Sequence, residues 1–489
     1  LSDPFCAMPG AAEKLTLNVP GAGQYQACQS TEGASQEKPQ HAHADSERAK
    51  SCIFLAQFVE AIAFTGIIVD SYQVCKALGA STAFSGLLVG LWSAGCTVGV
   101  LSMMMVLEAW PSAWRHLRRI LLFCQSLDLV GASAYAAVLV YALGLQGDDG
   151  GGERTGAIYL LAGVRVVWGV GSGVVGHCGG VVITMITSDE DLPNQQQARM
   201  FWQSLGLGFG PMLAGTVIFL DQTKSNSGLP PLHHVGAVIT VVQLLAMILV
   251  WAACPAKLEA WVAPPSSTSE TRPASSDSLA SPLDHSPRTQ LCFLFSCFLL
   301  NGLRAYAIAS AEVGTSLLLE ISFRWDRHLI GFMIGSAFLA CIPLRGIYSS
   351  IRHKLDLVAW LRIFSLIAAW GALLTFSRAA RFFPDGMQLV VADCVMFPAL
   401  YLGEGLTRGL MCQYTRQHAV LTVSRACCFL VWFANLTCVL APWIARASIA
   451  SGMGQDLYAF SQLICCLLFF TCFELGVRPL LVSNTSESV

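Results

Sequence analysis

Charged residues are scarce in this sequence. Asp, Glu, Lys and Arg make up only 12% of its 489 residues, about half the share of an ordinary globular protein. The 29 basic residues do not exceed the 31 acidic ones, so the chain lacks the basic excess that attracts phosphate backbones. We therefore expect no nucleic-acid partner.

Metal-ligand and catalytic groupings are missing as well. The chain has 19 cysteines, but most of them, such as Cys52 and Cys465, lie inside apolar runs without the spacing or histidine partners of a zinc site. We interpret them as small packing residues. No nucleophile, base and orienting residue are grouped on the polar segments. The sequence thus predicts no enzyme, no cofactor and no metal site.

Apolar runs are what the sequence has in abundance. Hydrophobic residues make up 54% of the chain and the mean hydropathy is +0.57. Many runs approach about twenty residues, which is longer than the helices of a soluble core require. They are continuous rather than alternating, which excludes barrel strands, and only helices then satisfy the backbone groups in lipid. The sequence predicts an all-α polytopic membrane protein.

The apolar runs predict about twelve transmembrane helices in two six-helix halves. The first six are expected at about residues 52–71, 84–107, 119–143, 157–187, 201–220 and 234–254. The second six are expected at about residues 290–318, 329–348, 357–376, 387–406, 418–443 and 456–476.

Polar segments frame these halves. Residues 255–289 are rich in Ser and Pro and cannot bury enough apolar surface to offset the entropy of ordering, so we expect a disordered cytoplasmic linker. Residues 1–50 are expected to form a disordered cytoplasmic tail, and residues 477–489 a short cytoplasmic one. The helical halves then cover residues 51–254 and 290–476.

The distribution of Lys and Arg predicts that both termini are cytoplasmic. With that orientation the inside segments hold the greater number of basic residues: Arg48, Lys50, Arg115, Arg118, Arg119, Arg345, Arg352, Lys354, Arg408, Arg416 and Arg425. The opposite loops hold fewer, such as Lys76, Arg154, Lys224 and Arg446. An even number of spans requires both termini on one side, in agreement with this distribution.

A weak internal repeat supports the division into halves. The second span carries Gly86 and Gly90, and the eighth carries Gly331 and Gly335. Glycines at this spacing let two helix backbones approach closely. Each half also has a basic loop after its second span.

Together these features resemble the major facilitator superfamily. The loop with Arg115, Arg118 and Arg119 looks like part of that family's first cytoplasmic signature, although Trp114 stands where the signature has an Asp. The fifth span resembles a second signature through residues that open a close-packing face and loosen the helix locally: Gly206, Gly210, Pro211, Ala214 and Gly215.

Two further stretches are similar to one branch of that superfamily. They are the first span, from Phe58, and the seventh with its exit, from Ala311. The branch contains lysosomal and vacuolar members, including the transmembrane part of SPX-linked vacuolar phosphate transporters. No SPX-like helical domain fits into the first 50 residues. The resemblance leaves open whether the membrane is the plasma membrane or a vacuolar or lysosomal one.

We single out six of the charged residues inside predicted spans, and five of them define the candidate site. A charge at mid-bilayer costs about 2.5–3.5 kcal/mol even on the lenient scale, so each needs a partner or a wet cavity. In the family fold the first, fourth, seventh and tenth spans line a central cavity. Five residues lie on those spans: Glu60, Arg165, Arg304, Glu312 and Asp393. The sixth, Asp128, lies on the third span.

Depth along the helices suggests how these charges pair. At about 1.5 Å per residue, Glu60 and Arg165 differ in level by roughly 6 Å, within reach of two long side chains. The resemblance implies that Glu60 takes up and releases a proton as this pair breaks and forms. Asp393 and Arg304 could form the mirrored pair. Static ion pairs that fix helix register remain the alternative for all of these residues.

The sequence therefore predicts a secondary transporter that works as a monomer in the lipid bilayer. Its partners would be a small solute and protons, and two mid-membrane arginines are compatible with an anion such as phosphate or an organic acid; sugars stay open. One site would be exposed to each side in turn by rocking of the halves. The alternative is a non-transporting membrane sensor or scaffold that retains the fold.

Overall fold

The structure is a computed structural model of the whole chain. It describes residues 38–144, 151–224, 233–258, 287–384, 386–417, 421–451 and 454–479. The chain divides into a small unit, residues 1–41, and a large unit, residues 42–489. The following description concerns the large unit.

Helices make up nearly all of the described chain, and twelve of them are long and apolar enough to cross a membrane. The first half contains α1 (Lys38–Gly66), α2 (Ile68–Ala77), α3 (Thr82–Ala109), η1 (Ala113–His116), α4 (Leu117–Gly144), α5 (Gly151–Ile186), α6 (Leu192–Lys224) and α7 (His233–Ala253). The second half contains α8 (Pro287–Ile321), α9 (Arg327–Leu339), α10 (Cys341–Ile351), η2 (Arg352–Lys354), α11 (Leu357–Leu374), η3 (Ser377–Phe382), α12 (Met387–Gln417), α13 (Val423–Ala450), α14 (Gly454–Cys472) and η4 (Phe473–Val477). The prediction of twelve spans is confirmed.

Several helix ends follow from local hydrogen-bond chemistry. Ser81 precedes α3 and accepts a hydrogen bond from the Phe84 backbone N–H, at 3.2 Å. Asp356 and Thr422 cap α11 and α13 in the same way. Each side-chain oxygen satisfies a backbone donor that the first turn leaves without a partner.

Three predicted boundaries are wrong, and two of them affect the site. Helix α1 already begins at Lys38, so the tail expected over residues 1–50 is helical in its last part; residues 1–37 lie outside the described residues, as does most of the linker. Helix α6 begins at Leu192 rather than at about residue 201. Helix α12 continues to Gln417 rather than ending at about residue 406. Polar residues at these ends masked the continuation of apolar helices.

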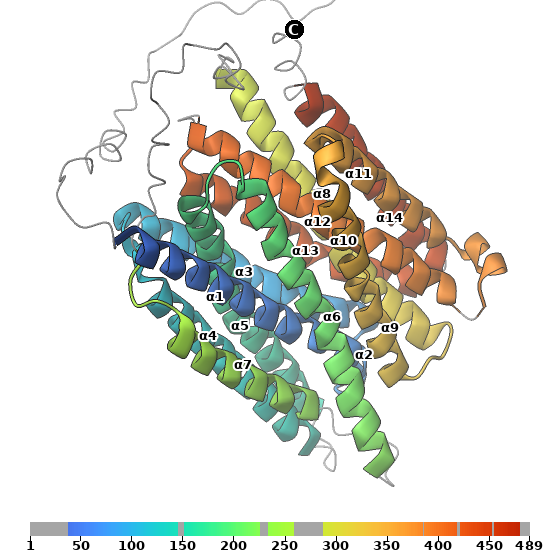
Figure 1. Cartoon of the computed structure of the whole chain (residues 1–489). Helices are drawn as coiled ribbons and strands as arrows, with labels where there is room; N and C mark the ends of the chain where they lie inside the picture. The colour runs from blue at the N-terminus through green and yellow to red at the C-terminus, as the bar shows by residue number, and fades with distance from the viewer. Residues whose placement is uncertain are drawn as a thin grey trace, which may run out of the picture. The chain divides into compact units, whose positions relative to one another are not determined.

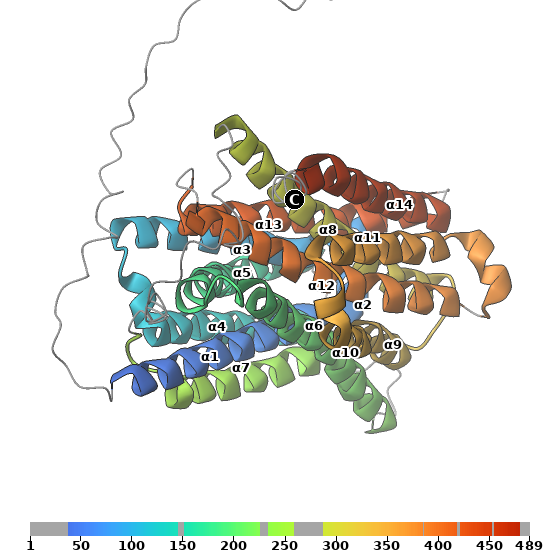
Figure 2. The same ribbon diagram turned by 45° about the horizontal axis from the view of Figure 1, so that its top comes forward.

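The two halves lie side by side, as Figures 1 and 2 show for the blue-to-green helices α1–α7 and the yellow-to-red helices α8–α14. They meet mainly through two helix pairs, α3 with α13 and α6 with α9, and α6 also packs on α12. We call the end of the bundle at which α1 begins the N-terminal side, and the other end the opposite side.

Glycine makes the contact between α3 and α13 possible. A Cβ atom at Gly86 would collide with the Pro442 carbonyl oxygen, and one at Gly90 with the Val439 carbonyl oxygen. The two backbones therefore touch where the sequence has its first GxxxG pattern.

The second GxxxG pattern lies at the other contact between the halves. A Cβ atom at Gly331 of α9 would lie 2.5 Å from the Pro211 carbonyl oxygen of α6, and one at Gly335 2.5 Å from the Gly208 carbonyl oxygen. Gly215 of α6 faces the His328 carbonyl oxygen in turn. Both patterns of the repeat thus face the other half.

The remaining glycines of the fifth-span signature face the first span. Gly206 packs on the Phe58 carbonyl oxygen, and Gly210 packs on Thr65 and Gly66 of α1. One side of α6 therefore touches its own half and another side touches α9. Such a helix can transmit a displacement between the two.

The basic loop after α3 lies on the N-terminal side. Arg115 belongs to η1, and its carbonyl oxygen accepts a 2.8 Å hydrogen bond from the Leu258 N–H that follows α7. The Arg118 guanidinium lies 5.6 Å from the centre of the Trp251 ring, and Arg119 is exposed. Trp114, which replaces the Asp of the family signature, is buried at 7% exposure.

Enlarging Gly86 tests the contact between α3 and α13. We expect Gly86→Val to destabilise this arrangement by about 1–3 kcal/mol, because the new side chain forces two backbones apart. Thermal unfolding of the purified protein should show a lowered midpoint. Gly163→Val on α5 is the matched control, since a Cβ there meets no atom within 4 Å; an equal loss in both variants would contradict the interpretation.

Candidate functional site

A cavity of about 120 Å³ lies between the two halves. Helices α1, α3, α5 and α6 contribute to its wall from the first half, and α8, α12 and α13 from the second. The polar residues of the wall are Gln57, Glu60, Ser93, Ser172, Arg199, Gln203, Glu312, Tyr401, Glu404, Arg408 and Asn435. Aromatic and aliphatic side chains, among them Phe64, Trp92 and Leu207, fill the rest. A small, largely apolar space with several converging charges is typical of a solute site.

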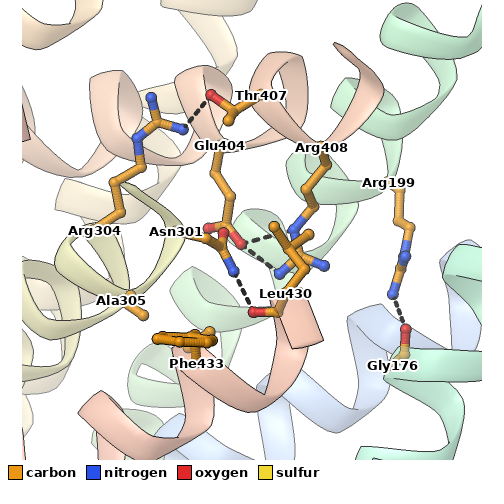
Figure 3. A network of polar contacts seen from close by, with 12 residues as sticks. Gly176, Arg199, Asn301, Arg304, Ala305, Glu404, Thr407, Arg408, Leu430 and Phe433 are labelled. Carbon is orange, nitrogen blue, oxygen red and sulfur yellow. Dashed lines mark hydrogen bonds and ion pairs between the residues drawn. The ribbon is translucent and has the colours of Figure 1, made fainter. Parts of the chain in front are cut away.

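Arg199 is the buried cation that the first half contributes to the cavity wall. It lies about two turns into α6 and is 2% exposed. Its Nε donates a 2.8 Å hydrogen bond to Gln57 Oε1, and its Nη2 donates to the Gly176 carbonyl oxygen (Figure 3). Both partners are neutral, and no ion pair to Arg199 is present in the part of the chain that the structure describes. The charge is thus hydrogen-bonded without being neutralised.

Arg408 is the corresponding cation of the second half. Its Nε donates a 2.8 Å hydrogen bond to Glu404 Oε1, four residues earlier on α12, and both side chains are buried (Figure 3). Arg199 and Arg408 also both line a void of about 10 Å³ that lies next to the cavity towards Cys412 and Cys427. The two arginines therefore form the end of the cavity that faces the N-terminal side.

Glu60 lies in the cavity wall on α1, about one turn after Gln57, the hydrogen-bond partner of Arg199. It is 6% exposed, and its Oε1 has no hydrogen-bond partner among the described residues. The charged groups that act on it are Asp128 and Arg199. Arg199 is therefore the cation that can respond to the charge of Glu60.

Arg165 does not form the expected ion pair with Glu60 among the described residues. Its side chain lies over Trp168, with the guanidinium 5.2 Å from the ring centre, and its Nε is 3.5 Å from the Leu88 carbonyl oxygen. It is fully buried and is not part of the cavity wall. The estimate of level was compatible with a pair, but level alone does not fix the direction in which a helix points a side chain.

The mirrored pair of Arg304 and Asp393 is not formed within the described residues either. Arg304 Nη1 donates a 3.1 Å hydrogen bond to Thr407 Oγ1, and its guanidinium lies 4.2 Å from the Phe469 ring centre (Figure 3). Asp393 is buried beside Thr315. Neither residue lines the cavity. Asp128 is buried against Gly171 of α5, also away from the cavity wall.

Glu312 is the second expected residue that lines the cavity. It is 1% exposed, and its Oε1 has no hydrogen-bond partner among the described residues. Asp393 is the charged group that acts on it. Of the five predicted site residues, the structure thus places Glu60 and Glu312 in one cavity and the other three outside its wall.

Sequence analysis missed Arg199, Glu404 and Arg408. The predicted spans began at about residue 201 and ended at about residue 406, so Arg199 fell outside and Arg408 was counted as a cytoplasmic charge. One signal could have found the second pair, because Glu404 and Arg408 stand four residues apart, the spacing of a helical ion pair.

Polar contacts between the halves close the opposite side of the cavity. Asp70 of α2 pairs with Arg327 of α9 at 3.3 Å, and Gln73 of α2 is hydrogen-bonded to Glu320 of α8. Arg446 of α13 reaches across to the first half, where it donates to Ser71 at 2.8 Å and to Ser85. Arg446 is 1% exposed, although the sequence placed it in a loop.

A second set of contacts closes the N-terminal side. Arg416 of α12 pairs with Asp189, before α6, at 2.8 Å, and Arg425 of α13 pairs with Glu108 of α3. Gly409 of α12 packs against Pro193 of α6. The site is therefore enclosed by contacts between the halves at both ends.

Comparison with known proteins identifies the fold. The sequence matches no protein-family model and no curated protein sequence. The structure is similar to that of the human organic anion transporter MFSD10 (TETRAN), with a TM-score of 0.56 and 16% identity over 87% of this chain and 99% of that one. The structure is also similar to that of a bacterial homologue of the iron transporter ferroportin, with a TM-score of 0.57 and 13% identity over 87% of this chain and 98% of that one.

A third similar structure is the major facilitator superfamily proton:xylose symporter XylE. Its TM-score is 0.59 at 10% identity, over 88% of this chain and 96% of that one. The agreement covers nearly the whole of each solved chain. The chain therefore has the major facilitator fold, as the sequence predicted.

Removing Arg446 tests the closure of the opposite side. Arg446→Gln loses two charge-assisted hydrogen bonds, so we expect the open population to rise about tenfold or more. Cys96 and Cys438 line the cavity, and their labelling by a small polar thiol reagent, located by mass spectrometry, should accelerate. Arg381→Gln, at an exposed position of η3, is the matched control; equal rates in both variants would show that Arg446 does not hold the bundle closed.

Proposed function

We propose that this chain is a secondary transporter of the major facilitator superfamily that moves a small solute across a membrane. The main support is the cavity, which is lined by both halves and contains three carboxylates and two guanidinium groups. Charge in a membrane bundle is costly unless it serves a wet site. The solved structures with the same fold are named as transporters of organic anions, iron and xylose.

Alternating access is the proposed mode of transport. The halves are joined by glycine-lined contacts and by one polar contact set at each end of the cavity. Opening one set while the other stays closed would expose the site to one side at a time. Rocking about α3–α13 and α6–α9 requires little repacking inside either half. This supports the predicted role of Gly206, Gly210, Pro211 and Gly215.

Proton coupling is proposed at Glu60, with Arg199 in the place that sequence analysis gave to Arg165. When Glu60 is ionised, it is a counter-charge for Arg199. When Glu60 binds a proton, the Arg199 charge becomes available to an anionic group of the solute. A proton and an anionic group would therefore bind cooperatively, which is the requirement for symport.

The proposals for orientation and type of membrane rest on the sequence alone. The segments between spans on the N-terminal side hold more Lys and Arg than those on the opposite side, which supports a cytoplasmic location of the N-terminal side. The likeness of the first and seventh spans to vacuolar and lysosomal members stays a prediction, as does the monomeric state.

A sensor or scaffold that retains the fold is the second candidate. Its support is the basic loop, where buried Trp114 replaces the Asp of the family signature, so that loop cannot form the usual salt bridge. The polar contact sets at both ends of the cavity favour the transporter, because a static scaffold has no need of them.

Uptake into proteoliposomes tests this function. A panel of anions, sugars and amino acids is offered with and without an inward proton gradient. We expect at least one solute to accumulate with the gradient. Glu60→Gln should still exchange that solute but no longer concentrate it, because the variant cannot carry the proton.

The matched control is Glu190→Gln, at an exposed position before α6, which should behave as the wild type. If the wild type moves nothing while another transporter in the same lipids is active, the scaffold is the better proposal. If Glu60→Gln concentrates solute normally, transport stands but the coupling site is elsewhere.

A further inference from the structure

The charges of the cavity are separated along its length. Arg199 and Arg408 lie at the end that faces the N-terminal side, next to the smaller void. Glu60 and Glu404 are the next charged residues along the cavity wall. Glu312 lies on α8, and Tyr401 is within electrostatic range of both Glu312 and Glu404.

One hydrogen bond relates the depth of Glu312 in the bundle to that of the arginines. Arg304 of α8 donates to Thr407 of α12 at 3.1 Å, so these residues, and with them Arg408, lie at similar levels. Glu312 is eight residues further along α8, which is about 12 Å towards the opposite side. Glu312 thus lies at the other end of the cavity from the two arginines.

Glu312 and Arg408 point towards each other. Helical side chains lean towards the helix N-terminus. Helix α8 begins on the N-terminal side, so Glu312 leans towards the arginines. Helix α12 begins on the opposite side, so Arg408 leans towards Glu312, as its hydrogen bond to Glu404 shows.

An ampholytic solute offers a partner to both ends of the cavity. Glu312 and Arg199 are each nine-tenths or more buried, and neither has an ion-pair partner among the residues that the structure describes. A sugar brings no counter-charge to either residue, a simple anion brings none to Glu312, and a simple cation brings none to Arg199. Unpaired buried charges are costly.

We propose that the solute is a small ampholyte, such as an amino acid, which carries a carboxylate and an ammonium group. The carboxylate binds Arg199 and the free side of Arg408. The ammonium binds Glu312 and stabilises its ionised form. A cavity of about 120 Å³ limits the solute to a small size. This inference rests on the proposed transport function.

Matched solutes test the inference on the purified full-length protein. Binding is measured by calorimetry for the twenty α-amino acids, 4-aminobutyrate, phosphate and xylose. Each ampholyte that binds is compared with its deaminated acid and its decarboxylated amine, for example butyrate and butylamine for 4-aminobutyrate. We expect at least one ampholyte to bind about tenfold or more tightly than both analogues, since each loses one charge-assisted contact.

Variants assign the two ends. Glu312→Gln should bring the ampholyte and its deaminated acid to similar affinity, whereas Arg199→Gln should bring the ampholyte and its amine together. Glu312→Asp keeps the charge and should keep the preference, which separates charge from folding. Glu190→Gln is the matched control and should change neither affinity.

The outcomes separate this inference from the proposed function. Accumulation of a sugar or a simple anion, with no ampholyte bound more tightly than its deaminated acid, would overturn the inference and leave the transporter intact. A preference for ampholytes that Glu312→Gln leaves unchanged would also overturn it. If no solute of the panel binds or accumulates, both proposals are contradicted.

Discussion

Buried charge is the constraint on which the interpretation of this molecule depends. Arg199, Glu60 and Glu312 are almost fully buried in an apolar bundle, where each charge costs several kcal/mol unless it is compensated. The protein meets this cost in two ways. Arg304 is hydrogen-bonded outside the cavity and fixes helices, whereas Arg199, Arg408 and Glu312 line the cavity. These three residues are available for binding, Arg408 through the side that Glu404 leaves free.

The backbone contacts between the halves give these charges a way to change partners. Gly86 and Gly331 let helices of opposite halves touch through their backbones. Polar contacts at both ends, such as Asp70 with Arg327 and Arg416 with Asp189, are individually weak enough to break. The arrangement thus combines a firm pivot with two breakable closures, as alternating exposure requires.

Much of the fold could be predicted from sequence, because twelve long and continuous apolar runs can satisfy their backbone groups in lipid only as helices. The site could be predicted only in part. Glu60 and Glu312 stood out as acids inside clear apolar runs. Arg199 and Arg408 did not, because each lies near a helix end among polar residues, where hydropathy cannot tell a buried turn from a loop. The expected pair of Glu60 and Arg165 is not formed among the described residues, because depth along a helix says nothing about its rotation, which side-chain packing decides.

The measurement that tests the account most directly is a pair of distances across the two ends of the cavity. Spin labels carried by non-natural amino acids at Lys76 and Arg378 would report on the opposite side, and labels at Glu190 and His353 on the N-terminal side; all four positions are exposed. The account predicts that solute and pH change the two distances reciprocally, one lengthening as the other shortens. Two distances that stay fixed, or that rise together, would contradict a central site exposed to each side in turn.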